Sequence, residues 1–204
     1  MKNTITIYLK RFLPHEFVER IRSWRKALRQ KKRFGINKGR DLLCSVRVLD
    51  SKFSIYVNPF LNGGVDEVVH ETGFWEPELS ALLKKYLPAG GTFIDVGANI
   101  GYHSLFAVTV VGKEGMIVAF EPLPRLQDQF HRSIEANGFR NILIEPVALS
   151  DTFGNATLSL VEENVGASSI KDVAEERAVG GSVVVQVATL DSYLDKFDRV
   201  DVIK

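Results

Sequence analysis

The sequence predicts an α/β fold in which a parallel sheet carries helices on both faces. Three apolar segments, Thr92–Val96, Met116–Phe120 and Asn141–Leu149, alternate with two stretches of helical character. Strands that are apolar on both faces are typical of sheets covered on both sides, and the intervening helices make such strands parallel. A chain of 204 residues with 45% hydrophobic content is long enough for one such domain and an appendage.

The first 40 residues differ from the rest in charge. They hold 13 Lys and Arg against two acids, although the net charge of the whole chain is only +1. After Pro14, which can open a helix, apolar residues recur on one helical face at Phe17, Ile21, Trp24 and Leu28. We expect residues 1–40 to form a basic amphipathic helical segment. It either lies on the body of the protein with its charges solvated or makes peripheral contact with an anionic membrane.

Composition argues against several other classes of protein. The single cysteine, Cys44, cannot form an internal disulfide and suits a reducing compartment. The four histidines have no cysteine partners and no ligand-like spacing, so we expect no metal site. No apolar stretch reaches the roughly 18–20 residues of a membrane span, and charges interrupt the start of the chain where a signal peptide is apolar. We expect a cytoplasmic protein.

The basic clusters of the N-terminal segment do not indicate a nucleic-acid partner. The KKR and KGR clusters have no interleaved aromatic residues, and no recognition motif accompanies them. We therefore expect no nucleic acid to bind.

Residues 41–88 are predicted to lead into the core. Two short strands, Leu43–Val48 and Phe53–Val57, are joined across Asp50-Ser51-Lys52 as in a hairpin. A turn is indicated at Asn62-Gly63-Gly64. A helix opened by Pro77 then ends before Pro88.

Residues 89–204 are predicted to form the ligand-binding domain. The core strands are separated by a helix over Tyr102–Val111 and by a second helix that stops at Asn137-Gly138. The later segments are predicted as two strands around an exposed loop, a short helix and the start of a further strand, at Ala156–Val161, Ser182–Ala188, Thr189–Phe197 and Val200–Ile203.

Acids and glycines stand where the first two core strands end. Asp95 lies at the end of the first strand and is followed by Gly97 and Gly101, and Glu121 ends the second strand. Ligands of such sheets bind at the carboxyl ends of the strands, and an acid at the end of the second strand can accept two hydrogen bonds from a ribose diol. Glycines let the main chain turn sharply and approach a ligand. The pattern predicts a nucleoside ligand.

The glycine spacing favours one class of nucleoside. Dinucleotide sites use G-x-G-x-x-G and leave helix-end N–H groups free for a pyrophosphate, whereas here the spacing is G-x-x-x-G with Asp95 just before the first glycine. A carboxylate at this turn would repel a pyrophosphate and would suit the ammonium and sulfonium of S-adenosylmethionine. We expect that cofactor and not NAD.

Several blocks of the sequence resemble the FkbM-type methyltransferases. They occur in order as FIDVGANIGYHSLFA, VAFEPLP, ALSD (148–151), GASSI (166–170) and TLDSYL (189–194), and WEPE introduces the helix before them. The resemblance covers about Glu76 to Lys204. It implies a class I methyltransferase fold, Rossmann-like, and transfer of a methyl group to a hydroxyl oxygen, often on a sugar, glycan or natural product.

The resemblance also implies which residues bind the donor. The methionine part would be lined by the turn after the first core strand, at Asp95, Gly97, Ala98, Asn99 and Gly101. Glu121 would hold the ribose hydroxyls. Ala148, at the end of the third strand, would lie near the adenine through its backbone.

The chain departs from the family at its end. In the family the VDVIK strand runs on into a segment similar to IDVEGAE, with acids near the acceptor, whereas here Lys204 is the last residue. We therefore expect a domain truncated after the fourth core strand, and no catalytic residue is identified. Two alternatives to a working O-methyltransferase stay open, a donor-binding fragment without turnover and an NAD-dependent oxidoreductase.

Some of these residues have a purely structural interpretation as well. Asp95 can stabilise the N-terminus of the following helix, and Asn99 can serve an awkward turn conformation. His103, one turn into an apolar helix, is interpreted as a packed or surface residue. Glu76 and Glu78 are assigned to the first turn of a helix, with a role over the donor pocket as the alternative.

Overall fold

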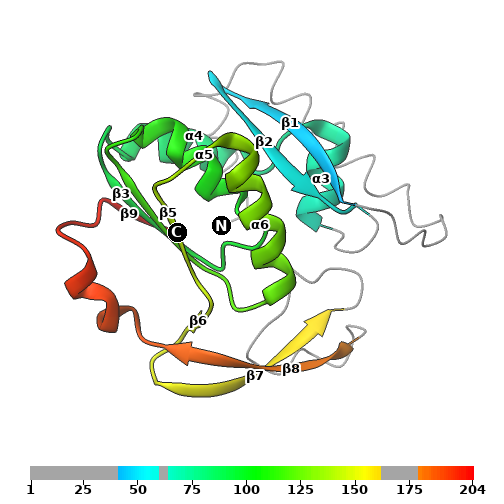
Figure 1. Cartoon of the computed structure of the whole chain (residues 1–204), viewed down its shortest axis with the longest axis vertical. Helices are drawn as coiled ribbons and strands as arrows, with labels where there is room; N and C mark the ends of the chain where they lie inside the picture. Colours follow the sequence, from blue (N-terminus) through cyan, green and yellow to red (C-terminus); the bar gives the residue numbers. More distant parts are fainter. Residues whose placement is uncertain (1–40, 60–63, 162–178) are drawn as a thin grey trace, which may run out of the picture. The chain divides into compact units, whose positions relative to one another are not determined.

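The computed structural model describes residues 41–59, 64–161 and 179–204 (Figure 1). The chain divides into two compact units, residues 1–37 and 38–204. The predicted helix within 1–40, most of the predicted turn at 62–64 and the GASSI block at 166–170 lie outside the described residues. The proposed division at residues 40 and 88 stays a prediction.

The core of the second unit is a four-stranded parallel sheet, which confirms the predicted fold class. Its strand order is β5-β4-β3-β9, and each neighbouring pair is parallel. The strands are β3 (Thr92–Val96), β4 (Met116–Phe120), β5 (Ile142–Glu145) and β9 (Val202–Ile203). The apolar runs predicted for β3 and β4 have the observed bounds, because each run is closed by an acid or a glycine turn.

One face of the sheet is covered by α5 (Tyr102–Val111), which lies against β3 and β4. Eight of its ten side chains are buried, as expected for a helix that is apolar all round. Its outer side is covered by an antiparallel hairpin of β1 (Leu42–Val48) and β2 (Ser51–Val57). The hairpin confirms the prediction for this segment and makes α5 an interior helix.

The other face of the sheet packs on a 3₁₀ helix, η2 (Leu190–Lys196). Tyr193 of η2 lies edge-on to Phe120 of β4, with ring centroids 4.9 Å apart and planes at 89°. Ile94, Val118, Val147 and Ala188 complete this buried cluster. Helices therefore cover both faces of the sheet, as predicted.

The single strand predicted over Asn141–Leu149 is wrong, because the segment divides between two sheets. β5 pairs with β4, whereas β6 (Ala148–Leu149) pairs with β8 in a second sheet of order β6-β8-β7 (Figure 1). Pro146 lies between them, has no N–H to donate and ends the pairing with β4. The second sheet contains the two later strands that the sequence predicted, β7 (Gly154–Val161) and β8 (Val179–Ala188).

A helix that the sequence did not predict follows the hairpin. α3 (Gly64–Thr72) buries Val68 and Val69 and contacts β2. Its valines have low helix propensity and a glycine-rich turn signal precedes it, so packing decides its conformation. The next helix, α4 (Pro77–Tyr86), begins at the predicted proline and lies against α5.

The open edge of β2 is closed by polar side chains of α6 (Pro124–Asn137). The Asn137 amide accepts from the N–H of Ser54 (2.7 Å) and donates to its carbonyl (2.6 Å). One and two turns earlier, Ser133 Oγ accepts from the Tyr56 N–H (2.9 Å) and Gln129 donates to the Tyr56 carbonyl (2.8 Å). Because unpaired strand edges and buried main-chain groups are costly, this row fixes the hairpin on α6.

The first prediction concerns this row. Replacing Asn137 with Ala removes both bonds to Ser54, and we expect the free energy of unfolding to fall by about 1–2 kcal/mol. Glu135→Ala is the matched control, because Glu135 is exposed on the same helix, and its effect should stay within about 0.5 kcal/mol. Urea denaturation of both variants measures the difference. Equal stabilities would show that the row does not hold the hairpin.

Candidate functional site

The turn between β3 and α5 is wound tightly in left-handed backbone conformations. Gly97, Asn99 and Gly101 have φ values of 67°, 57° and 80°. The Ala98 N–H donates to the Phe120 carbonyl (3.0 Å) at the end of β4. The Gly101 N–H donates to the Ala98 carbonyl (2.9 Å). These bonds hold the predicted donor turn over the carboxyl ends of the two central strands.

Glu121 is tied to the same turn by its carboxylate. Its Oε2 accepts from the Asn99 N–H (2.8 Å) and its Oε1 accepts from the Leu123 N–H (3.0 Å). The side chain is buried, which raises its pKa, while the two N–H donors oppose that rise. A carboxylate offers about four acceptor positions, so two remain for further donors such as hydroxyl groups.

The surroundings of Asp95 differ from those expected from the sequence, which predicted an unpaired negative charge at the mouth of the turn. The side chain is fully buried and forms an ion pair with Lys204, whose Nζ lies 2.7 Å from Oδ1. Its Oδ2 accepts from Ser104 Oγ (2.7 Å). A paired, sealed carboxylate does not repel a pyrophosphate through an exposed charge, so that step of the argument against a dinucleotide is wrong.

The side chain of Lys204 also contacts main-chain carbonyl groups of the turn. Its ammonium lies 3.4 Å from the Val96 carbonyl and 3.3 Å from the Gly97 carbonyl. Sequence reasoning missed both Lys204 and Ser104 as partners of Asp95. The signal was available for Ser104, a polar residue within an apolar helix. Lys204 lies beside Asp95 only because β9 is the neighbour of β3.

The two glycines of the motif have different physical roles. A Cβ at Gly101 would stand 2.1 Å from the ring of Phe130, so only glycine lets α6 approach the start of α5. A Cβ at Gly97 would meet no atom within 4 Å. Gly97 is exposed. Open space beside Gly97 is what a backbone approached by a ligand requires.

Ala148 lies in the second sheet, where it pairs with Val187 of β8. The preceding residue, Val147, packs in the cluster with Phe120, so β6 leaves the core sheet beside the end of β4. Of the other six predicted residues, Asp95 lies in β3, four lie in the β3–α5 turn, and Glu121 directly follows β4. The role of each of the seven residues toward a donor stays a prediction.

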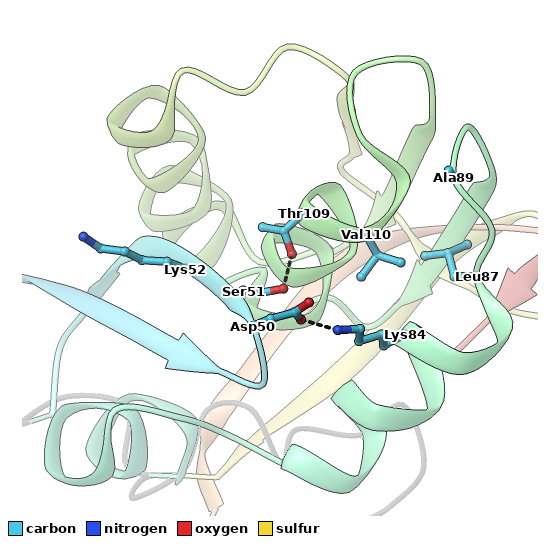
Figure 2. A pocket seen from close by; sticks show the side chains of 8 residues that line it. All are labelled: Asp50, Ser51, Lys52, Lys84, Leu87, Ala89, Thr109 and Val110. Atoms are coloured by element: carbon cyan, nitrogen blue, oxygen red, sulfur yellow. Dashed lines mark hydrogen bonds and ion pairs between the residues drawn. The ribbon is translucent and has the colours of Figure 1, made fainter.

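A separate hollow of about 460 Å³ lies near the amino end of β3 (Figure 2). Four of its polar side chains pair with one another: Lys84 forms an ion pair with Asp50, and Thr109 Oγ1 donates to Ser51 Oγ (2.7 Å). Leu87 and Ala89 precede β3, so this hollow is at the other end of the strand from the donor turn. None of the predicted site residues lines it.

Within residues 41–59, 64–161 and 179–204, no group of three or more His, Cys, Asp or Glu side chains is arranged to hold a metal ion. Among the helices of the same ranges, none has both the length and the apolar character that crossing a membrane requires.

Comparison with known proteins identifies relatives of this domain. The profile of the methyltransferase FkbM domain matches residues 95–204, more than half of the chain. Protein-L-isoaspartate O-methyltransferase 1 of Archaeoglobus fulgidus is 22% identical over 129 residues, 60% of this chain and 59% of its own. The corresponding enzyme of Methanococcus aeolicus is 23% identical over 105 residues, 50% of this chain and 48% of its own. The chain thus spans about half to three fifths of these curated relatives.

Two solved structures are similar to parts of this chain. A T. thermophilus 16S rRNA methyltransferase in complex with AdoMet and guanosine has a TM-score of 0.39 at 19% identity, covering 56% of this chain and 29% of its own. A SAM-dependent methyltransferase from Aquifex aeolicus has a TM-score of 0.33 at 23% identity, covering 39% of this chain and 41% of its own.

The second prediction separates the two glycines. Gly101→Ala should lower the free energy of unfolding by about 2–4 kcal/mol, because the new methyl group clashes with Phe130 in a left-handed backbone. Gly97→Ala should cost only about 1–2 kcal/mol of backbone strain but should weaken binding of S-adenosylhomocysteine. Gly138→Ala is the control, because Gly138 is left-handed (φ 66°), has open space and lies at the far end of α6.

Unfolding curves and calorimetry measure these effects. Gly97→Ala and Gly138→Ala should lose similar stability, and only the former should lose affinity. Equal affinities in these two variants would remove Gly97 from the site.

The third prediction uses the pKa of Glu121. Because burial raises this pKa above its ordinary 4.5, the folded chain binds more protons here than the unfolded chain in the window above about pH 4.5. The contribution of Glu121 to the free energy of unfolding therefore falls as pH rises through that window. Glu121→Gln removes this pH-dependent contribution. The free energy of unfolding of the variant minus that of the wild type should therefore increase as pH rises. Urea unfolding from about pH 4.5 to 7 tests this, and parallel curves would contradict it.

Proposed function

Because the chain belongs to the FkbM methyltransferase family, we propose that it transfers the methyl group of S-adenosylmethionine to a hydroxyl oxygen. The family match confirms the predicted enzyme class and its donor, and favours that class over the oxidoreductase alternative. The acceptor that we propose is a sugar, a glycan or a natural product, as the sequence resemblance implies. Peripheral membrane contact through residues 1–40 stays a prediction.

The observation that carries the proposal is the link between Glu121 and the donor turn. The Asn99 N–H holds one oxygen of Glu121 at 2.8 Å, so the acid at the end of β4 and the turn after β3 form one unit. The ribose hydroxyls of S-adenosylmethionine lying over this edge could donate hydrogen bonds to the remaining acceptor positions of Glu121. The methionine part of the same ligand would then run along the turn toward Gly97. This is the placement expected of a ligand at the carboxyl edge of a parallel sheet.

Oxygen as the acceptor atom is supported by the curated relatives. Three of them are named as O-methyltransferases, acting on protein L-isoaspartate. Methyl transfer is an in-line displacement at carbon, so the enzyme chiefly holds the acceptor oxygen, the methyl carbon and the sulfur near a straight line. Such positioning can supply roughly 7–11 kcal/mol. A hydroxyl acceptor also needs a base with a suitable pKa.

The fourth prediction tests the donor and the transfer separately. Isothermal titration calorimetry on the folded chain should detect S-adenosylmethionine and S-adenosylhomocysteine but not NADH. Glu121→Ala should weaken both adenosyl ligands by about 10-fold or more, because two hydroxyl bonds to a charged group are lost. Absence of heat with either adenosyl ligand, on protein shown to be folded, would refute donor binding.

Incubation with methyl-labelled donor and a panel of sugars, glycans and hydroxylated small molecules then reports transfer by mass spectrometry. Labelled acceptor supports the O-methyltransferase. Donor binding without labelling of any acceptor would favour the alternative of a donor-binding domain without turnover.

A further inference from the structure

Glu76 stands immediately before α4 in a backbone conformation that is unusual for its residue type. Its φ and ψ are 38° and 64°, in the left-handed region that non-glycine residues rarely adopt. The main chain nevertheless uses this conformation to start α4, since the Leu79 and Ser80 N–H groups both donate to the Glu76 carbonyl. Such strain is retained only where the surroundings fix it, and it is found often at ligand-binding positions.

The carboxylate of Glu76 is held by a buried histidine. Oε2 of Glu76 lies 3.1 Å from Nε2 of His103, whose side chain is only 5% exposed whereas that of Glu76 is 49% exposed. The other ring nitrogen of His103, Nδ1, has no hydrogen-bond partner in the described part of the chain. The ring therefore has one polar contact there, and that contact orients Glu76. The interpretation of His103 as a packed residue is correct but incomplete.

The charge of Glu76 is fixed as well as its position. The hydrogen bond from His103 holds the pKa of Glu76 below its ordinary value against the effect of partial burial, and the Lys204 ammonium lowers it further. A carboxylate with a low pKa is a poor general base near neutral pH. It is a good counter-ion for a cation, because it stays ionised.

The charge of the Lys204 ammonium acts on Glu76 as well as on the two acids of the predicted site. Lys204 pairs with Asp95 at 2.7 Å and lowers the pKa of both Glu76 and Glu121. The Lys204 ammonium thus contacts Asp95, and its charge also acts on Glu76 and Glu121. Asp95 is fully buried and paired, and Glu121 is only 5% exposed. Of these three acids, Glu76 is the one whose charge reaches the surface.

We infer that Glu76, oriented by His103, receives the α-ammonium of the methionine part of the donor. This assigns to Glu76 the electrostatic role that the sequence gave to Asp95, and it rests on the proposed binding of S-adenosylmethionine at the β3–α5 turn. His103 is a positioning residue that acts through Glu76. Asp95, in turn, keeps Lys204 in place and does not itself meet the ligand.

The fifth prediction compares two ligands that differ at the ammonium. S-adenosylhomocysteine carries the amino acid group, and 5′-methylthioadenosine lacks it. Glu76→Gln should weaken S-adenosylhomocysteine by about 10- to 100-fold, because a charged hydrogen bond is lost, and should leave 5′-methylthioadenosine unchanged. Glu78→Gln, which removes a carboxylate from the first turn of the same helix, should change neither. Calorimetry gives the affinities, and thermal unfolding checks that the variants are folded.

The variant His103→Asn distinguishes a positioning role of His103 from a merely structural one, because only a positioning role predicts a selective loss of affinity. The variant should weaken S-adenosylhomocysteine selectively, and the double variant with Glu76→Gln should bind no more weakly than Glu76→Gln alone, since His103 acts through Glu76. Equal losses for both ligands in Glu76→Gln would show a structural role only. Unchanged or tighter binding of S-adenosylhomocysteine would show that Glu76 does not meet the ammonium. Failure of the wild type to bind either ligand would instead refute the proposed function.

Discussion

The ion pair between Asp95 and Lys204 is the contact on which the geometry of the site depends. A carboxylate removed from water is costly unless it is paired and hydrogen-bonded, and Asp95 has both an ammonium and a serine hydroxyl. The pair joins β3 to β9 across the sheet, and the same ammonium lies near the Gly97 carbonyl. One side chain 109 positions later in the sequence therefore satisfies the buried acid and supports the turn that follows it.

The support of the turn extends outward through α5 and α6. α5 carries Ser104 against Asp95 on one side and packs on the hairpin with the other, where Tyr102 meets the ring of Phe53 edge-on at 5.4 Å. α6 places Phe130 against Gly101 and closes the edge of β2 with its polar row. The hairpin is thus part of the scaffold of the site, although none of the predicted donor residues belongs to it.

Local patterns predicted the segments that carry their own signals. The strands β3 and β4 and the helix α5 between them have the predicted bounds, because apolar runs and glycines mark their ends. The valine-rich helix α3 forms through tertiary packing against its propensity, and Pro146 divides what hydrophobicity alone presents as one strand. For the site, the positions of Asp95 and Glu121 followed from the strand ends. The partner of Asp95 depends on strand order, and the link from Glu76 to His103 depends on helix packing; neither is a local property.

The contact between Gly101 and Phe130 limits which substitutions this sequence can accumulate during evolution. The ring occupies the volume that any side chain at position 101 would need, so the two positions cannot vary independently. A descendant that acquires alanine at 101 has to shrink position 130 at the same time, and a smaller residue at 130 alone leaves a void beside the turn. The glycine of the motif is therefore inherited together with an aromatic ring 29 positions away, for a reason of volume that holds whether or not a ligand is bound.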